Sequence, residues 1–192
     1  HIYVFSTIAL NNVLKKFDLE IFDIQNTNTH GGSNRYFIKK KINNLYKIKG
    51  SVRAEIKKEL KFGLHKFSTY KKFSLKVKNS KIKLLNIFSK IKKKKLKVIG
   101  YGATAKSCTV LNYCQVGGNF IKYFYDTTSY KIGKYLPGSK ILIKKYKKLD
   151  RKNVDLVFLG AWNFKDEIFK KEKDFIKKGG KFIVHIPSPK II

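Results

Sequence analysis

The stretch 97–107, KVIGYGATAKS, constrains the fold of this chain more than any other part of its sequence. A short apolar run ends in the tripeptide GYG and passes at once into residues of helical character, which is typical of a strand, a tight turn and a helix start. Gly100 permits the turn, Gly102 lets a ligand approach the backbone, and Ala105 allows close helix–strand packing. Because the first amides of such a helix point outward at the positive end of its dipole, we predict a phosphate-binding turn.

The sequence from residue 96 onward alternates between expected strands and expected helices. The strands are expected at 97–100, 120–126, 140–143, 155–160 and 181–187, and the helices at 104–115 and 165–178. This alternation favours an α/β fold with a Rossmann-like, mostly parallel sheet covered on both faces. Ligands of such sheets bind at the carboxyl ends of the strands. We therefore expect residues 100–106, 126–135 and 160–163 to meet at one edge and form a binding site.

The first 95 residues have a different organisation. Residues 1–40 read as a helix and two strands around a turn at 29–33, and we interpret them as the tail of a second α/β domain. Residues 41–95 interleave Lys and apolar residues at helical spacing and predict a helical linker. We expect residues 96–192 to form the Rossmann-like domain. Because the sequence contains no Met and begins with His1, we expect that sequence upstream of it is missing.

The charge of the chain could indicate a nucleic-acid-binding protein. The formal net charge is +32, and 44 of the 192 residues are Lys or Arg. Only Arg35, Arg53 and Arg151 are arginines, although proteins that read phosphates and base edges usually rely on the planar fork of Arg. We therefore favour a compositional bias of surface positions over a nucleic-acid partner, and we keep a basic nucleic-acid-binding module as an alternative.

Cysteine content and hydropathy bear on the compartment. The two cysteines, Cys108 and Cys114, fit a reduced cytoplasmic chain better than a disulfide framework. No segment is long and apolar enough to span a membrane, and no signal peptide is visible. We expect a cytoplasmic protein without a membrane partner, and the sequence shows no metal-ligand spacing.

Two groups of residues suggest that the chain binds a nucleotide or another anion. Asp126 ends a predicted strand 24 residues after Gly102, where dinucleotide-binding folds place an acid that binds ribose, although it fits a turn-capping Asp equally well. Together with the G-x-G-x-x-A pattern, it keeps an NAD(P)-dependent oxidoreductase open as an alternative. His30, followed by two glycines, Ser33 and Arg35, fits either an anion-binding turn or a plain hairpin turn. No catalytic triad or pair of catalytic carboxylates can be assembled, which favours a binding site.

Seven segments, taken together, resemble one known protein family. They read HIYVFS (1–6), THGGSNR (29–35), GYGATAK (100–106), NYC (112–114), YKIGKYLPG (130–138), AWNFKDEI (161–168) and GGKFIVHIP (179–187). In this order they are similar to the C-terminal part of the S-adenosylmethionine-dependent C-methyltransferases that act on nucleotide-linked keto-sugars. Typical members read HEHIYYFS, THGGSLR, GYGAPAKG, LPGTHIPI, PWN and GGKFIVPIP. The resemblance covers nearly the whole chain and is weakest over 41–95.

The resemblance implies a division of the full-length enzyme into parts. The family has an N-terminal zinc-binding segment, a central methyl-donor domain and a C-terminal Rossmann-like domain that helps to hold the sugar nucleotide. Residues 1–40 would be the last elements of the donor domain, and the zinc ligands and most of the S-adenosylmethionine site would lie upstream. His1 aligns with the last residue of the family's Tyr-x-Glu-His motif, a proposed base that removes the proton alpha to the sugar ketone. The 192 residues alone are then expected to lack methyl transfer.

The same resemblance implies the residues that bind a nucleotide diphosphate sugar. The glycine turn and the loop 130–138 would hold the diphosphate, and 30–35 would line the sugar–phosphate side. The expected substrate-binding residues are His30, Gly31, Gly32, Ser33, Arg35, Gly100, Gly102, Lys106, Asp126, Tyr130, Lys131, Tyr135, Pro137, Gly138, Trp162 and Asn163. The chain departs from the family pattern at Thr104 and Ser107, where Pro and Gly are usual, and at Ala161 and His185, where Pro is usual.

Overall fold

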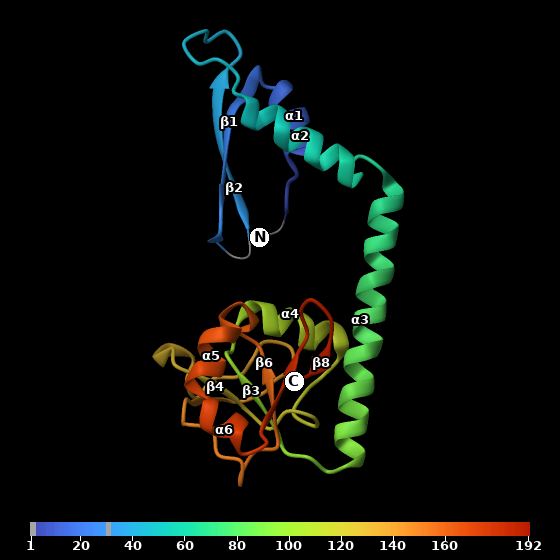
Figure 1. Ribbon diagram of the computed structural model, residues 1–192, viewed down its shortest axis with the longest axis vertical. Coiled ribbons are helices and arrows are strands. Elements are labelled where there is room, and N and C mark those ends of the chain that lie inside the picture. The colour runs from blue at the N-terminus through green and yellow to red at the C-terminus, as the bar shows by residue number, and fades with distance from the viewer. Residues whose placement is uncertain (1–2, 30–31) are drawn as a thin grey trace. The chain divides into compact units, whose positions relative to one another are not determined.

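The computed structural model describes residues 3–29 and 32–192. The chain divides into two compact units, His1–Leu75 and Lys76–Ile192, which we call the hairpin unit and the sheet unit. The boundary falls inside the long helix α3 (Phe67–Lys93), as Figure 1 allows the reader to follow by colour. The segment 41–95, predicted as a helical linker, therefore contributes α2 (Gly50–Phe62) and the start of α3 to the first unit, and the larger part of α3 to the second.

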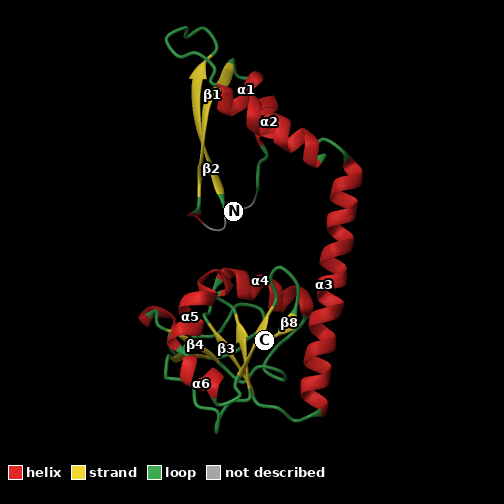
Figure 2. Ribbon diagram, viewed as in Figure 1, coloured by secondary structure: helices red, strands yellow, loops and turns green. Residues whose placement is uncertain are grey.

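The hairpin unit is built around two antiparallel strands, β1 (Leu19–Thr27) and β2 (Ser33–Lys40). The helix α1 (Thr7–Lys15) precedes them. The Ser6 hydroxyl accepts a hydrogen bond from the Ala9 backbone N–H at 3.1 Å, which satisfies one of the unpaired amides of the first helical turn. The predicted order of helix, strand, turn and strand is thus confirmed (Figure 2).

The two helices α1 and α2 pack on the hairpin through a small apolar cluster of Leu14, Ile21, Ile24 and Val52. Where the strand register shifts after Ile21, the buried Asp23 accepts hydrogen bonds from the Ser51 hydroxyl at 2.7 Å and the Lys49 ammonium at 2.6 Å. The hydrogen bonds from Lys49 and Ser51 hold the pKa of the Asp23 carboxyl below its usual value. They join the first turn of α2 to β1.

The sheet unit contains a six-stranded sheet with the strand order β5-β4-β3-β6-β7-β8. Its strands are β3 (Val98–Tyr101), β4 (Phe124–Asp126), β5 (Ile143–Lys145), β6 (Leu156–Leu159), β7 (Lys181–Val184) and β8 (Lys190–Ile191). All neighbouring strands are parallel except β8, which pairs antiparallel to β7. The chain leaves β3 in one direction and returns to β6 on its other side, so the sheet has a switch point between these strands. The predicted Rossmann-like α/β fold is confirmed.

Helices cover both faces of this sheet, as a parallel sheet requires. On one face, α4 (Ala105–Cys114) and the end of α3 pack through Leu111 and Phe88 against alternate strand residues such as Phe158. On the other face, α5 (Lys165–Lys171) and α6 (Lys173–Lys177) pack through Ile168 and Phe175. They contact the intervening strand residues, whose side chains point to this face, such as Val157. Because side chains alternate across a strand, both sets are buried and the strands read as continuous apolar runs.

The structure differs from the predicted elements at five places, one of which is the strand predicted at 181–187, which ends at Val184. The strand predicted at 120–126 is reduced to β4, because Phe120 and Ile121 turn back to the Gly117 carbonyl. The strand predicted at 140–143 lies instead at β5, and the helix predicted at 165–178 is broken at Glu172 into α5 and α6. The short strand β8 was not predicted. None of the helices within 3–29 and 32–192 is long and apolar enough to cross a membrane.

Candidate functional site

A pocket of about 320 Å³ lies at the carboxyl ends of β3 and β4, beside the start of α5. We call it the carboxyl-edge pocket. It sits at the switch point of the sheet, where open α/β folds bind their ligands. Three of the predicted site residues line it, namely Gly102, Asp126 and Lys131. The structure therefore brings together residues from the glycine turn, the end of β4 and the following loop, as the strand alternation predicts.

The glycine turn is closed by tight backbone packing. Gly102 has φ +83°, a conformation that side chains disfavour, and a Cβ there would lie 2.5 Å from the Ala161 Cβ. A Cβ on Gly160 would meet the Gly102 carbonyl oxygen, which belongs to backbone and moves little. Gly100 faces the ring of Phe124 and does not line the pocket. Gly100 therefore serves the packing of β3 against β4, whereas Gly102 forms the wall of the pocket.

Asp126 holds the turn and the following loop together. Its carboxylate accepts hydrogen bonds from the backbone N–H of Ala103 and from that of Thr128, both at 2.8 Å. Burial raises the pKa of this carboxyl, but the hydrogen bonds from Thr128 and Ala103 and the nearby Lys131 outweigh burial, and the pKa lies below its usual value. The capping role that the sequence suggested for Asp126 is thus present, and its carboxylate also faces the pocket.

Lys131 is fixed on the same wall. Its ammonium lies 3.6 Å from the Asp126 carboxylate and donates a hydrogen bond to the Ala103 carbonyl at 3.0 Å. This side chain comes from the short 3₁₀ helix at Ser129–Lys131. The loop predicted to hold a diphosphate therefore reaches the glycine turn through Lys131.

The first turn of α4 satisfies part of its own hydrogen-bonding capacity. The Thr104 hydroxyl accepts from the Ser107 N–H at 3.1 Å, and the Ser107 hydroxyl accepts from the Thr104 N–H at 2.9 Å. The two departures from the family pattern thus form one reciprocal capping box. The backbone N–H groups of Thr104 and Ser107, which the sequence predicts as phosphate ligands, thus donate hydrogen bonds within the protein, and the Ala103 N–H donates to Asp126.

The other predicted residues of the sheet unit lie outside the lining of this pocket. Lys106 and Trp162 form a pair, with the ammonium 5.4 Å from the centre of the indole ring, and Asn163 is exposed next to them. Tyr130 and Tyr135 are exposed. The Pro137 carbonyl accepts a hydrogen bond from the Asn112 amide at 3.0 Å, and Gly138, at φ +77°, packs on the same amide. Asn112 therefore positions the tip of the loop 130–138.

A buried cluster beside the pocket was missed by the sequence analysis. Glu172 is fully buried, and its carboxylate accepts hydrogen bonds from the Tyr146 hydroxyl at 2.7 Å, the Tyr101 hydroxyl at 3.3 Å and the Leu149 N–H at 3.3 Å. Burial and the neighbouring carboxylate raise the pKa of Tyr146 to about 12, and the same two causes, burial first, raise that of Tyr101. Lys171 lies 3.7 Å from the centre of the Tyr146 ring. Within a helical pattern, Glu172 carried no signal that it points inward.

His185 follows β7 and is buried. Its ring stacks on Phe158 at 5.3 Å, and its Nδ1 atom has no hydrogen-bond partner among the described residues. Burial lowers the pKa of His185 from 6.5 to about 4. The folded chain therefore holds this imidazole neutral.

The variant His185→Leu is expected to reduce the acid sensitivity of folding. Above pH 6.5 the imidazole is neutral in both the folded and the unfolded chain, so it does not affect the free energy of unfolding. As the pH falls from 6.5 towards 4, the unfolded chain binds a proton at this imidazole that the folded chain does not bind. The parent should then lose up to about 3 kcal/mol of unfolding free energy over this window, and the variant should not. Urea unfolding at pH 7 and pH 4.5 measures the difference. The matched control is His65→Leu at an exposed position, and equal pH slopes in the parent and His185→Leu would contradict this role.

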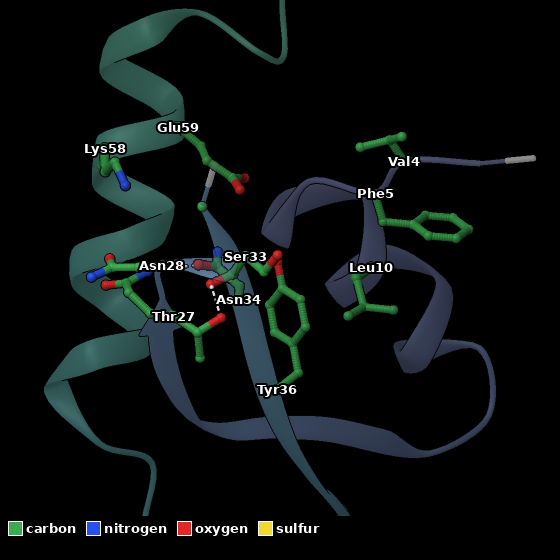
Figure 3. A pocket seen from close by; sticks show the side chains of 12 residues that line it. Val4, Phe5, Leu10, Thr27, Asn28, Ser33, Asn34, Tyr36, Lys58 and Glu59 are labelled. Atoms are coloured by element: carbon green, nitrogen blue, oxygen red, sulfur yellow. Dashed lines mark hydrogen bonds between the residues drawn. The ribbon is translucent and has the colours of Figure 1, made fainter. Parts of the chain in front are cut away.

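A second pocket, of about 690 Å³, lies within the hairpin unit. We call it the hairpin pocket. In Figure 3, Phe5 and Leu10 lie on one side of the Tyr36 ring, and Thr27 and Ser33 lie on the other. The lining thus combines apolar groups with hydroxyls and amides.

Glu59 fixes the helix that borders the hairpin pocket. Its carboxylate oxygens accept hydrogen bonds from the Thr7 N–H at 2.6 Å and the Ile8 N–H at 2.8 Å, so a side chain of α2 caps the first turn of α1. The Thr7 hydroxyl in turn lies 3.1 Å from the Tyr36 hydroxyl. The sequence analysis missed Glu59, because its partners lie about fifty residues away along the chain.

The predicted residues around the hairpin turn fall into three groups. Gly32 and Ser33 line the hairpin pocket. Arg35 is exposed and is not part of the lining, whereas its neighbours Asn34 and Tyr36 are. His1, His30 and Gly31 lie outside the described residues.

Within the described part of the chain, no group of three or more His, Cys, Asp or Glu side chains is placed to hold a metal ion. Cys108 and Cys114 are both free thiols. Zinc, which the family resemblance implies for the full-length enzyme, therefore finds no fitting ligand set among these residues.

Comparison with known proteins adds two findings. A sequence model described as the C-methyltransferase C-terminal domain matches residues 28–187, from the hairpin turn to just beyond β7. The chain is also similar to the C-methyltransferase NovU of Streptomyces niveus, with 30% identity over 192 residues. The aligned region is the whole of this chain and 46% of that relative. The chain thus spans about half the length of the curated relative that it matches.

Proposed function

This chain belongs to the C-methyltransferase C-terminal domain family, and from this premise we propose that it binds the nucleotide-linked keto-sugar substrate of a C-methyltransferase. The observation that carries the proposal is the carboxyl-edge pocket, which lies inside the matched region and gathers Gly102, Asp126 and Lys131 at the switch point of the sheet. The glycine turn, the loop 130–138 and the pair Lys106–Trp162 supply the remaining proposed contacts.

The proposal assigns methyl transfer to the full-length protein. Because the chain spans 46% of its relative, we propose that most of the S-adenosylmethionine site, and a zinc site, belong to sequence outside these 192 residues. S-adenosylmethionine, when bound, supplies an electrophilic methyl group. The 192-residue chain is accordingly expected to bind substrate without methylating it. Methyl transfer by this chain alone would contradict the assignment.

His1 is the proposed general base. A neutral imidazole can accept the proton from the carbon alpha to the keto group of the sugar, which leaves an enolate whose carbon is the nucleophile. The assignment comes from the alignment of His1 with the last residue of the Tyr-x-Glu-His motif. In the full-length enzyme, His1→Gln should lower kcat by about 100-fold or more with little change in substrate affinity.

Binding measurements distinguish the proposed substrate class from the nicotinamide alternative. Isothermal titration of the 192-residue chain with thymidine diphosphate and with NAD⁺ should show clear binding of the first and at least about tenfold weaker binding of the second. Titration with a single-stranded oligonucleotide at low and high salt separates specific binding from charge attraction, since nonspecific binding to a polyanion falls steeply with salt. Binding of NAD⁺ without binding of thymidine diphosphate would contradict the proposed function.

A further inference from the structure

The charges around the carboxyl-edge pocket are balanced, unlike those of the rest of the chain. The chain carries 44 basic and 12 acidic residues. Yet the lining has two acids, Asp126 and Glu167, against two cations, Lys131 and Lys171. Glu172 adds a third carboxylate directly behind two tyrosines of the lining. The pocket therefore offers no excess of positive charge to a diphosphate.

The two lysines of the pocket are also partly engaged by the protein. The Lys131 ammonium binds the Ala103 carbonyl and lies 3.6 Å from Asp126. The Lys171 ammonium lies over the Tyr146 ring at 3.7 Å, where the electron-rich ring face attracts a cation. A diphosphate bound here would compete with these contacts and would approach two carboxylates. A neutral ligand group would neither compete for the two lysines as an anion does nor be repelled by the carboxylates.

The remaining lining is suited to a sugar hydroxyl and a flat ring. Thr104 and Thr128 present hydroxyl-bearing side chains, and the Asp126 carboxylate has accepting positions beyond the two backbone N–H groups that it binds. Phe164, at the start of α5, also lines the pocket and is 55% exposed. An exposed aromatic ring of this kind provides a stacking surface for a nucleic base. The volume of about 320 Å³ lies at the small end of ligand pockets.

We infer that the carboxyl-edge pocket holds the nucleoside portion of the ligand, that Phe164 stacks on its base, and that the diphosphate lies outside this pocket. This inference rests on the proposed function and makes it more specific. It places the ribose beside Asp126 and the base beside Phe164. It also places the phosphates outside the set of residues that contact the nucleoside.

The test compares Phe164→Ala with a matched control in the 192-residue chain. Tyr113→Ala removes an exposed aromatic ring from α4, outside the pocket. The probes are thymidine diphosphate, inorganic pyrophosphate and NAD⁺, with affinities measured by calorimetry and by amide chemical shifts. Because base–aromatic stacking contributes substantially to affinity, Phe164→Ala should weaken thymidine diphosphate binding by about tenfold or more. It should leave pyrophosphate binding unchanged, and Tyr113→Ala should change neither.

The possible outcomes separate the inference from the proposed function. If thymidine diphosphate binds the parent and Phe164→Ala equally well, the inference is overturned and the proposed function stands. If only NAD⁺ binds, and Phe164→Ala weakens it by about tenfold, the nucleoside pocket is supported while the proposed function fails. If neither nucleotide binds, both are overturned. If Phe164→Ala weakens pyrophosphate as much as thymidine diphosphate, the diphosphate lies at Phe164 and the inference is wrong.

Discussion

Replacing Glu172 with alanine should lower the free energy of unfolding by about 3–5 kcal/mol, because the buried carboxylate accepts hydrogen bonds from three groups that have little access to water. The hydroxyls of Tyr101 and Tyr146 and the amide of Leu149 would be left without this acceptor. Glu172→Gln keeps the shape and one acceptor oxygen but turns a donor towards the cluster, so its loss should be smaller. Urea unfolding followed by circular dichroism measures both.

The matched control for Glu172 is Asp166→Ala, on the neighbouring helix α5. Asp166 is 89% exposed in its side chain, and its carboxylate lies 3.6 Å from the Lys165 ammonium. Exposed pairs of this kind contribute little, so the change should remain within about 0.5 kcal/mol. If Glu172→Ala behaved like Asp166→Ala, the buried carboxylate would not organise this part of the sheet unit.

Gly160→Val should be at least as damaging, with an expected loss of about 4 kcal/mol or more. The new Cβ would meet the Gly102 carbonyl oxygen, the Ser107 Cβ at 3.0 Å and the Phe124 ring, so relief requires the backbone of two strand ends to move. This displacement would separate the glycine turn from the loop after β6 and open the carboxyl-edge pocket. Gly160→Ala adds the same Cβ against the Gly102 carbonyl oxygen and should already cause a large part of this loss.

Gly118→Val is the control for this position. A Cβ on Gly118 would have no atom within 4 Å, and its φ lies outside the left-handed region. The free energy of unfolding of this control should therefore lie within about 1 kcal/mol of that of the parent. Similar losses for Gly160→Val and Gly118→Val, measured by urea unfolding, would show that the contact between the two strand ends tolerates an added side chain.

The sequence predicts the parts of this fold that depend on local pattern. The first helix precedes the hairpin, the glycine turn joins β3 to α4, and continuous apolar runs mark the buried strands. These features follow from residues that are neighbours in the chain. They were sufficient to place Gly102, Asp126 and Lys131 at one edge of the sheet.

The features that the sequence analysis missed depend on contacts between distant residues. Glu172 reaches Tyr101, which lies 71 positions earlier, and in a lysine-rich helical pattern it resembles a surface acid. Phe120 and Ile121 are apolar enough for a strand, but their backbone turns back to Gly117 instead of pairing. The strand β8 consists of two exposed residues and becomes a strand only through its pairing with β7. In each case the partner decides the structure.

Because of the reciprocal hydrogen bonds between Thr104 and Ser107, we expect the residues at these two positions to vary together. Each hydroxyl accepts a hydrogen bond from the backbone amide of the other residue, and the Pro and Gly of the family pattern carry no hydroxyl that could do so. A substitution at only one of the two positions would break this reciprocal pair of hydrogen bonds and leave one backbone amide without its side-chain partner. The pair is therefore expected to be exchanged together among related sequences, so that mixed pairs would be rare at this turn.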